Sequence, residues 1–70
     1  MKRIFKGLIK VKVIKDFMRK NGLDIKKLSQ LSGVSVYIIR AILSGNSNIG
    51  LLHLLKIARV MGVNFVDLLN

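Results

Sequence analysis

The residues of this chain that could do chemistry are mostly cations. Thirteen Lys and Arg stand against three Asp and one His, which gives a formal net charge of +10 at pH 7. Such a charge predicts a polyanionic partner, with nucleic acid as the first candidate and an acidic membrane surface as the second. A solvated basic surface without a dedicated ligand is the alternative. Ten of the thirteen cations lie in the first 27 residues: Lys2, Arg3, Lys6, Lys10, Lys12, Lys15, Arg19, Lys20, Lys26 and Lys27.

The other reactive residue types are too few for catalysis. The chain has no Cys, which excludes disulfides and thiolate metal sites. Asp16, Asp24, Asp67 and His53 are scattered along the sequence, so they do not form the spacing of a zinc site or of a general acid–base pair. We therefore expect no enzymatic activity, no metal and no cofactor.

The sequence also lacks the features of a membrane protein. No uncharged stretch reaches the roughly 20 apolar residues that a membrane helix needs. The basic start resembles a signal peptide, but Lys6, Lys10 and Lys12 interrupt any apolar region. We therefore expect a protein that stays in the cytoplasm, associated with the nucleoid.

Gly, Asn, Asp and Ser divide the chain into five predicted helices. Seventy residues make one small all-α domain, for which we expect a basic arm at 1–10 and a helical domain at 11–70. The helices are expected at residues 11–21, 25–32, 36–44, about 49–61 and 65–69. The side chains expected to cap the last four are Asp24, Ser35, Asn48 and Asn64.

The third of these helices has two distinct faces when its residues are placed at about 100° each. The inner face carries Ile38, Ile39, Ile42 and Leu43. The outer face carries Tyr37, Arg40, Ala41 and Ser44. The predicted inner residues of the other helices are Val13, Ile14, Phe17 and Met18 in the first, Leu28 and Leu31 in the second, and Leu51, Leu54, Leu55, Ala58 and Met61 in the fourth.

Two short helices joined by "SGVS" resemble the helix-turn-helix of the phage repressor and Cro-type (XRE-like) DNA-binding family. The match extends beyond the turn: "IKDFMRKNGL" resembles the first helix of the family, and "LLKIARVMGVNFVDLL" resembles its closing helices. The resemblance covers residues 14–70. It implies a compact five-helix repressor-like domain and a DNA-binding transcriptional regulator, such as a small phage-like or mobile-element repressor.

The resemblance also implies which residues meet double-stranded DNA, because the third helix of the family lies in the major groove. The base-contacting residues would be Ser35, Val36, Tyr37 and Ala41. The residues meeting the DNA backbone would be Lys26, Lys27, Arg40, Asn46, Ser47 and Asn48. The family usually binds as two-fold dimers, and the apolar residues expected at a homodimer interface are Leu52, Val60 and Phe65.

The sequence departs from the family pattern at several positions. Members often have Gln where Ile25 stands, and its amide binds phosphate, which Ile cannot do. Val36 and Ala41 offer only apolar contact, for instance to a thymine methyl, so we expect weak or A·T-leaning specificity. An Arg and a Glu that pair in many members are replaced by Met18 and Leu43, which we expect to keep the contact as an apolar one.

Other functions remain open at this point. The domain could keep the fold but serve as a protein-binding module or antirepressor, with Ile25, Leu31, Val36 and Ile38 as an apolar patch. Residues 1–20 could form an amphipathic helix on anionic lipid. The basic arm could follow the DNA backbone, keep the protein soluble, or pair two subunits. His53 is expected at the surface.

Overall fold

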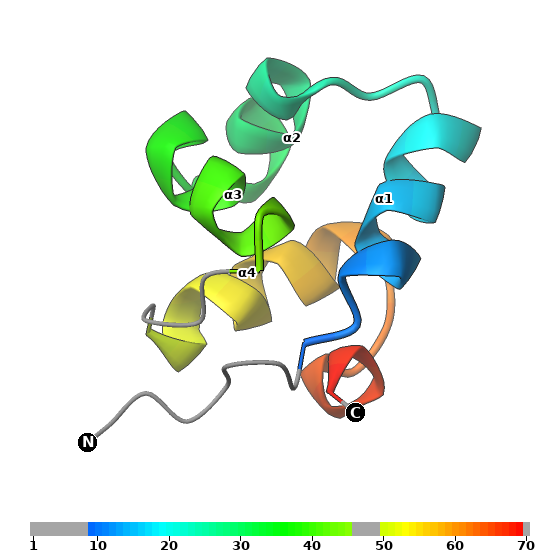
Figure 1. Ribbon diagram of the computed structural model, residues 1–70, viewed down its shortest axis with the longest axis vertical. Coiled ribbons are helices and arrows are strands. Elements are labelled where there is room, and N and C mark those ends of the chain that lie inside the picture. The colour runs from blue at the N-terminus through cyan, green and yellow to red at the C-terminus, as the bar shows by residue number, and fades with distance from the viewer. Residues whose placement is uncertain (1–8, 46–49, 70) are drawn as a thin grey trace.

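Four α-helices and one short 3-10 helix make up the part of the chain that the structure describes. The structure is a computed structural model, and it describes residues 9–45 and 50–69. The elements are α1 (Val11–Lys20), α2 (Ile25–Ser32), α3 (Val36–Leu43), α4 (Leu51–Met61) and η1 (Phe65–Leu68) (Figure 1). The all-α prediction is confirmed, but the last predicted helix is a single 3-10 turn. No helix in these ranges has the length and apolarity needed to cross a membrane.

Two of the predicted helix caps are present. The Lys27 N–H donates to Asp24 Oδ1 at 2.8 Å, and the Ile38 N–H donates to Ser35 Oγ at 3.1 Å. Both bonds satisfy an N–H group that has no partner within its own helix. Asn64 makes no side-chain capping bond to η1, so that prediction is wrong. Asn48 lies outside the described residues, and the residue preceding α4 is Gly50.

Removal of the Asp24 cap is expected to destabilise the domain. Asp24→Ala should lower the free energy of unfolding by about 1 kcal/mol, because the Lys27 N–H loses its acceptor. Asn64→Ala is the matched control, since Asn64 also precedes a helix but caps nothing. Urea unfolding followed by circular dichroism measures both. Equal losses in the two variants would contradict the assignment of the cap.

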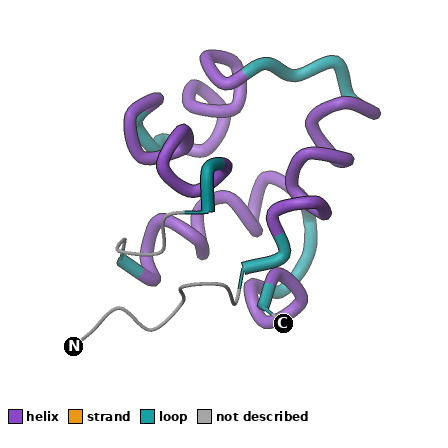
Figure 2. The backbone as a smooth tube through the Cα atoms, viewed as in Figure 1, coloured by secondary structure: helices purple, strands orange, loops and turns teal. Residues whose placement is uncertain are grey.

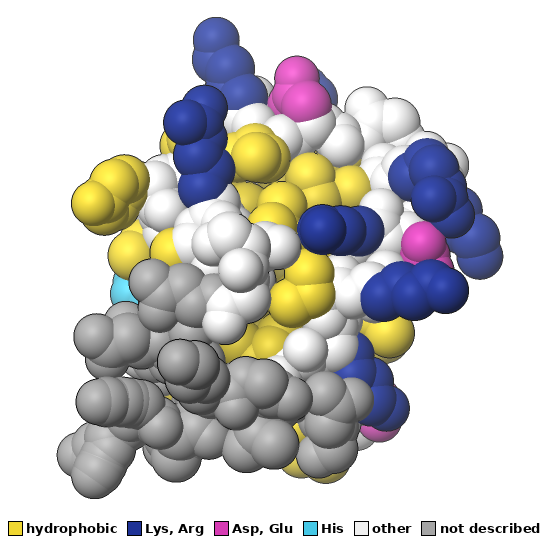
Figure 3. Space-filling model, viewed as in Figure 1, with side chains coloured by type: hydrophobic (Ala, Val, Ile, Leu, Met, Phe, Trp, Pro, Cys, Tyr) yellow, Lys and Arg dark blue, Asp and Glu magenta, His cyan; other side chains and the backbone are white. Residues whose placement is uncertain are grey.

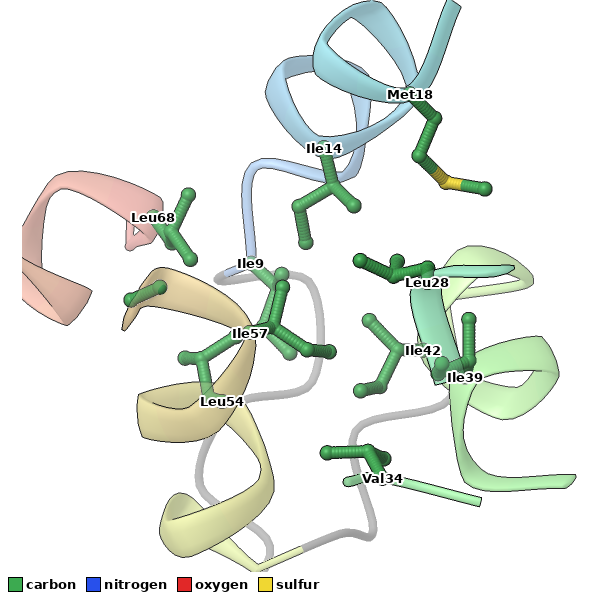
Figure 4. Packing of buried hydrophobic residues seen from close by; sticks show 11 residues of the cluster. Ile9, Ile14, Met18, Leu28, Val34, Ile39, Ile42, Leu54, Ile57 and Leu68 are labelled. Carbon is green, nitrogen blue, oxygen red and sulfur yellow. The ribbon is translucent and has the colours of Figure 1, made fainter. Parts of the chain in front are cut away.

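A single apolar core joins all five elements. Figure 4 shows side chains from the four helices and η1 pointing toward one another. Ile39 and Ile42 anchor α3, while Ile38 and Leu43 are half-buried and pack against the same core, so the predicted inner face of this helix is confirmed. The eight largest fully buried side chains are Ile14, Leu28, Val34, Ile39, Ile42, Leu54, Ile57 and Leu68.

The inner face of α2 differs from the prediction at Leu31, which is 56% exposed. Ser29 and Ser32 are half-buried, and their hydroxyls bind the backbone of the following turn. Ser29 Oγ donates to the Val34 carbonyl at 2.6 Å, and the Val34 N–H donates to Ser32 Oγ at 3.1 Å. At about 100° per residue, a helix that directs Leu28 and Ser29 toward the core and the turn places Leu31 outside.

The inner face of α4 is also rotated relative to the prediction. Leu54 and Ala58 are buried as expected, but Ile57 is fully buried too. Leu51 and Leu55, expected inside, are 39% and 36% exposed. In α1 the predicted Ile14 and Met18 are buried, whereas Val13 is exposed and Phe17 is half-buried.

The start of the described chain is attached to its end. Ile9 and Leu69 form an isolated antiparallel bridge, and the Lys10 N–H donates to the Leu68 carbonyl at 2.7 Å. In Figure 2 these two loop segments meet beside η1. Ile9 is only 8% exposed and belongs to the core. The folded part therefore includes Ile9 and Lys10, and the boundary expected after residue 10 is wrong.

Candidate nucleic-acid interface

The outer face of α3 is a shallow hollow with polar side chains at its edges. It is lined by Tyr37, Arg40, Ala41 and Ser44, the four residues predicted for this face. Tyr37 is 81% exposed, and Arg40 and Ser44 are exposed as well. Ala41 is half-buried and small, so the backbone of α3 can approach a ligand closely at that position. A phenol and a guanidinium standing beside a small residue suit contact with base edges and phosphates.

The turn before α3 fixes the direction in which this face points. Gly33 ends α2 with φ 79°, a conformation that favours glycine. Ser29 and Ser32 then bind the backbone of Val34, whose side chain is 1% exposed. The sequence analysis missed both serines. Their spacing of five and two residues before a buried residue was the available signal.

The start of α2 offers side-chain cations beside a backbone N–H that is already capped. Lys26 and Lys27 are exposed in its first turn. The carboxylate of Asp24 already accepts the Lys27 N–H, and its negative charge stands where a phosphate would approach the end of the helix. The two lysine ammonium groups are therefore the positive charges available to a phosphate at this end.

The described part of the molecule carries far more free cations than acids. In residues 9–45 and 50–69 the ion pair present joins Arg19 to Asp16 at 3.0 Å, and it is exposed, so its contribution to stability is small. Figure 3 shows Lys and Arg side chains gathered where α1 lies and projecting beside α2 and α3. At α2 and α3 themselves, the positive charge for a polyanion comes from Arg40 on the outer face of α3 and from the exposed Lys26 and Lys27.

Comparison with known proteins identifies the family. A family model described as helix-turn-helix matches residues 14–68, most of the chain. The chain belongs to the helix-turn-helix family. The match confirms the resemblance to repressor and Cro-type proteins and identifies a DNA-binding transcriptional regulator. In this helix-turn-helix protein, α2 and α3 are the two helices of the motif.

A solved structure has the same helix-turn-helix fold. It is the high-resolution crystal structure of the restriction-modification controller protein C.AhdI from Aeromonas hydrophila, with a TM-score of 0.73 and 24% sequence identity. The match covers 89% of this chain and 96% of that chain. At this identity the likeness establishes the fold and nothing further. A search of curated proteins gave no match.

The residues predicted for DNA contact lie where a helix-turn-helix protein could use them. Ser35 and Tyr37 are exposed, and Val36 and Ala41 are half-buried beside them. The hydroxyl oxygen of Ser35 accepts the Ile38 N–H, which leaves its proton free to donate. Three residues predicted to meet the DNA backbone lie outside the described part of the chain: Asn46, Ser47 and Asn48.

The apolar patch considered for a protein-binding module is mostly covered. Ile25 and Ile38 are half-buried and pack against the core, and Val36 is half-buried as well. Leu31 is the member that is exposed. The patch as predicted is therefore wrong, because the helix-turn-helix buries most of its area.

His53 is half-buried rather than at the surface. Its Nδ1 atom is buried and finds no hydrogen-bond partner within the described ranges. The same ranges contain no group of three His, Asp or Glu side chains that could hold a metal ion. His53 instead packs at the start of α4, where its ring lies 3.8 Å from the position that a Cβ on Gly50 would take.

Proposed function

We propose that this helix-turn-helix regulator places α3 in the major groove of an operator and acts as a small repressor. Ser35, Val36, Tyr37 and Ala41 contact base edges, while Lys26, Lys27 and Arg40 contact phosphates. The protein acts by occupying DNA on the nucleoid rather than by catalysis. Repression follows because this protein, once bound to the operator, blocks the access of other proteins to that DNA.

The observation that supports this proposal most directly is the exposure of Tyr37. A Tyr side chain that is 81% exposed on a short helix contributes little to the core, whereas Ile39 and Ile42 on the opposite side hold the helix in place. Arg40 lies one turn further along the same face. The helix is thus rigidly mounted with its hydrogen-bonding groups outward, which is what base reading requires.

The side chains of this face also predict the kind of specificity. Val36 and Ala41 can contact a thymine methyl but cannot donate or accept hydrogen bonds. Hydrogen-bonded reading then falls to Tyr37 and Ser35. We expect an A·T-leaning operator, with much of the affinity supplied by phosphate contacts and therefore sensitive to salt.

Selection from random duplex DNA tests the proposed function. The full chain should enrich a short A·T-leaning motif, and binding to the enriched duplex should exceed binding to a shuffled duplex at both low and moderate salt. The affinity should fall steeply as salt rises. Enrichment of no motif, or equal binding to the enriched and the shuffled duplex, would overturn sequence reading. Absence of binding at low salt would overturn DNA binding altogether.

We further propose that two copies bind as a homodimer through the outer side of α4. Leu52 is 59% exposed, and Leu51 and Leu55 beside it are partly exposed, so the first half of α4 presents a cluster of leucines. Such a cluster favours an interface. Val60 and Phe65, which the sequence also suggested for this interface, are half-buried against the core and offer less area.

Replacing Leu52 with Ser is expected to weaken this dimer. The dissociation constant should rise about tenfold or more, because a polar group replaces apolar area at the interface. Sedimentation equilibrium measures the change. Leu31→Ser is the matched control, since Leu31 is 56% exposed on a different surface and should leave the dimer intact. A dimer that is unchanged in Leu52→Ser, or weakened equally in both variants, would rule out this interface.

A further inference from the structure

A second hollow lies between the end of α2 and the second half of α4. Its lining consists of Leu31, Ser32, Lys56, Arg59 and Val60. Leu31 is 56% exposed and Val60 is half-buried, so the hollow has an apolar component. Lys56 and Arg59 supply two cations, three residues apart on α4 and therefore neighbours on one side of the helix. The hollow shares no residue with the outer face of α3.

The exposure of Leu31 follows from how the helix-turn-helix is built. The hydroxyls of Ser29 and Ser32 are committed to the backbone of Val34, and this orientation of α2 turns Leu31 outward. With these two bonds in place, the core leaves Leu31 56% exposed. An apolar residue that is held at the surface beside a hollow is available to a partner.

The two cations of the hollow have no acidic partner in the described part of the chain. All three aspartates lie there: Asp16 pairs with Arg19, Asp24 caps α2, and Asp67 lies in η1. None of them lines the hollow. Lys56 is half-buried, so its aliphatic stem contributes apolar wall to the hollow beside its ammonium group.

We propose that this hollow binds an acidic amphipathic segment of another protein. One bulky apolar side chain of the segment packs against Leu31 and Val60, and carboxylates on the segment meet Lys56 and Arg59. The apolar wall disfavours a nucleic-acid backbone, because the charged phosphates on either side of each sugar would lose water there. A second copy of this chain fits poorly, because Asp67 is its one aspartate outside a pair or a cap, and both copies are strongly basic.

Selection of peptides from a displayed random 12-residue library tests the proposal. The folded full chain is the bait, and its variants are used only afterwards, to test the enriched peptides. Enriched peptides should combine Asp or Glu with at least one large apolar residue. A synthetic peptide of the enriched sequence should bind the chain about tenfold more weakly after Leu31→Ser, and also after Lys56→Gln with Arg59→Gln. Val66→Ser changes an apolar residue of η1 that is 60% exposed and lies outside the hollow, and it should leave peptide binding unchanged.

Several results would overturn the proposal. These are a selection that enriches no peptide, enriched peptides without acidic residues, or binding that is unaffected by Leu31→Ser. Self-association of the chain that is lost on Leu31→Ser would assign the hollow to a second copy instead. The proposal is independent of DNA reading: Leu31→Ser should retain full affinity for the selected duplex, and loss of DNA binding in α3 variants should leave peptide binding intact.

Discussion

Replacing Tyr37 and Arg40 together with Ala is expected to weaken binding to the selected duplex about 100-fold at constant salt. Both side chains line the exposed hollow on α3, and neither supports the core. The double variant should therefore fold normally, as circular dichroism and thermal unfolding would show. Fluorescence anisotropy with a labelled duplex measures the loss of affinity.

The single variants Arg40→Ala and Tyr37→Ala should weaken DNA binding in different ways. Arg40→Ala removes a phosphate contact, so the slope of log affinity against log salt should fall by about one and the loss should be similar on any sequence. Tyr37→Ala should instead reduce the ratio of specific to non-specific binding. Arg59→Ala removes the same charge from α4 and is the matched control. An affinity that falls equally in Arg40→Ala and Arg59→Ala would mean that only net charge matters, which would contradict reading by α3.

The candidate site could be predicted from the sequence to the extent that α3 is amphipathic. Four branched apolar residues on one arc and a phenol with a guanidinium on the other leave one way to pack this helix, and the structure has it. The role of Asp24 at the candidate site was harder to predict from the sequence. A capping residue can be recognised from its position before a helix, but its effect on phosphate binding appears only once the start of α2 lies beside the motif.

The fold was less predictable where a helix is apolar on more than one side. In α4, leucines and other apolar residues occur around most of the helix, so periodicity alone does not choose the buried arc. Packing against α2 and η1 selects the side that carries Leu54, Ile57 and Ala58. The bridge between Ile9 and Leu69 is a contact between distant parts of the chain, and no local pattern indicates it.

The leucines of α2 are a second case in which an apolar residue type does not by itself identify the buried position. They also give the prediction with the largest expected effect on stability. Leu28 and Leu31 lie on one helix, one turn apart, and both are apolar residues that the sequence places inside. Leu28 is fully buried, whereas Leu31 is 56% exposed because the serine hydroxyls determine the rotation of the helix. Hydrophobicity alone would predict the same burial for both residues.

Leu28→Ala is expected to lower the free energy of unfolding by about 2 to 5 kcal/mol, because it removes buried area and leaves a cavity. A 70-residue domain typically has only about 4 to 10 kcal/mol of stability, so much of the folded state is lost and the midpoint of thermal unfolding should fall by roughly 10 °C or more.

Leu31→Ala is the control, with an expected change below about 1 kcal/mol. Unfolding of both variants at one protein concentration, followed by circular dichroism, separates the two residues. Comparable losses would mean that Leu31 packs inside, that Ser29 and Ser32 do not hold the turn, and that the hollow beside α4 is filled by this chain rather than left for a partner.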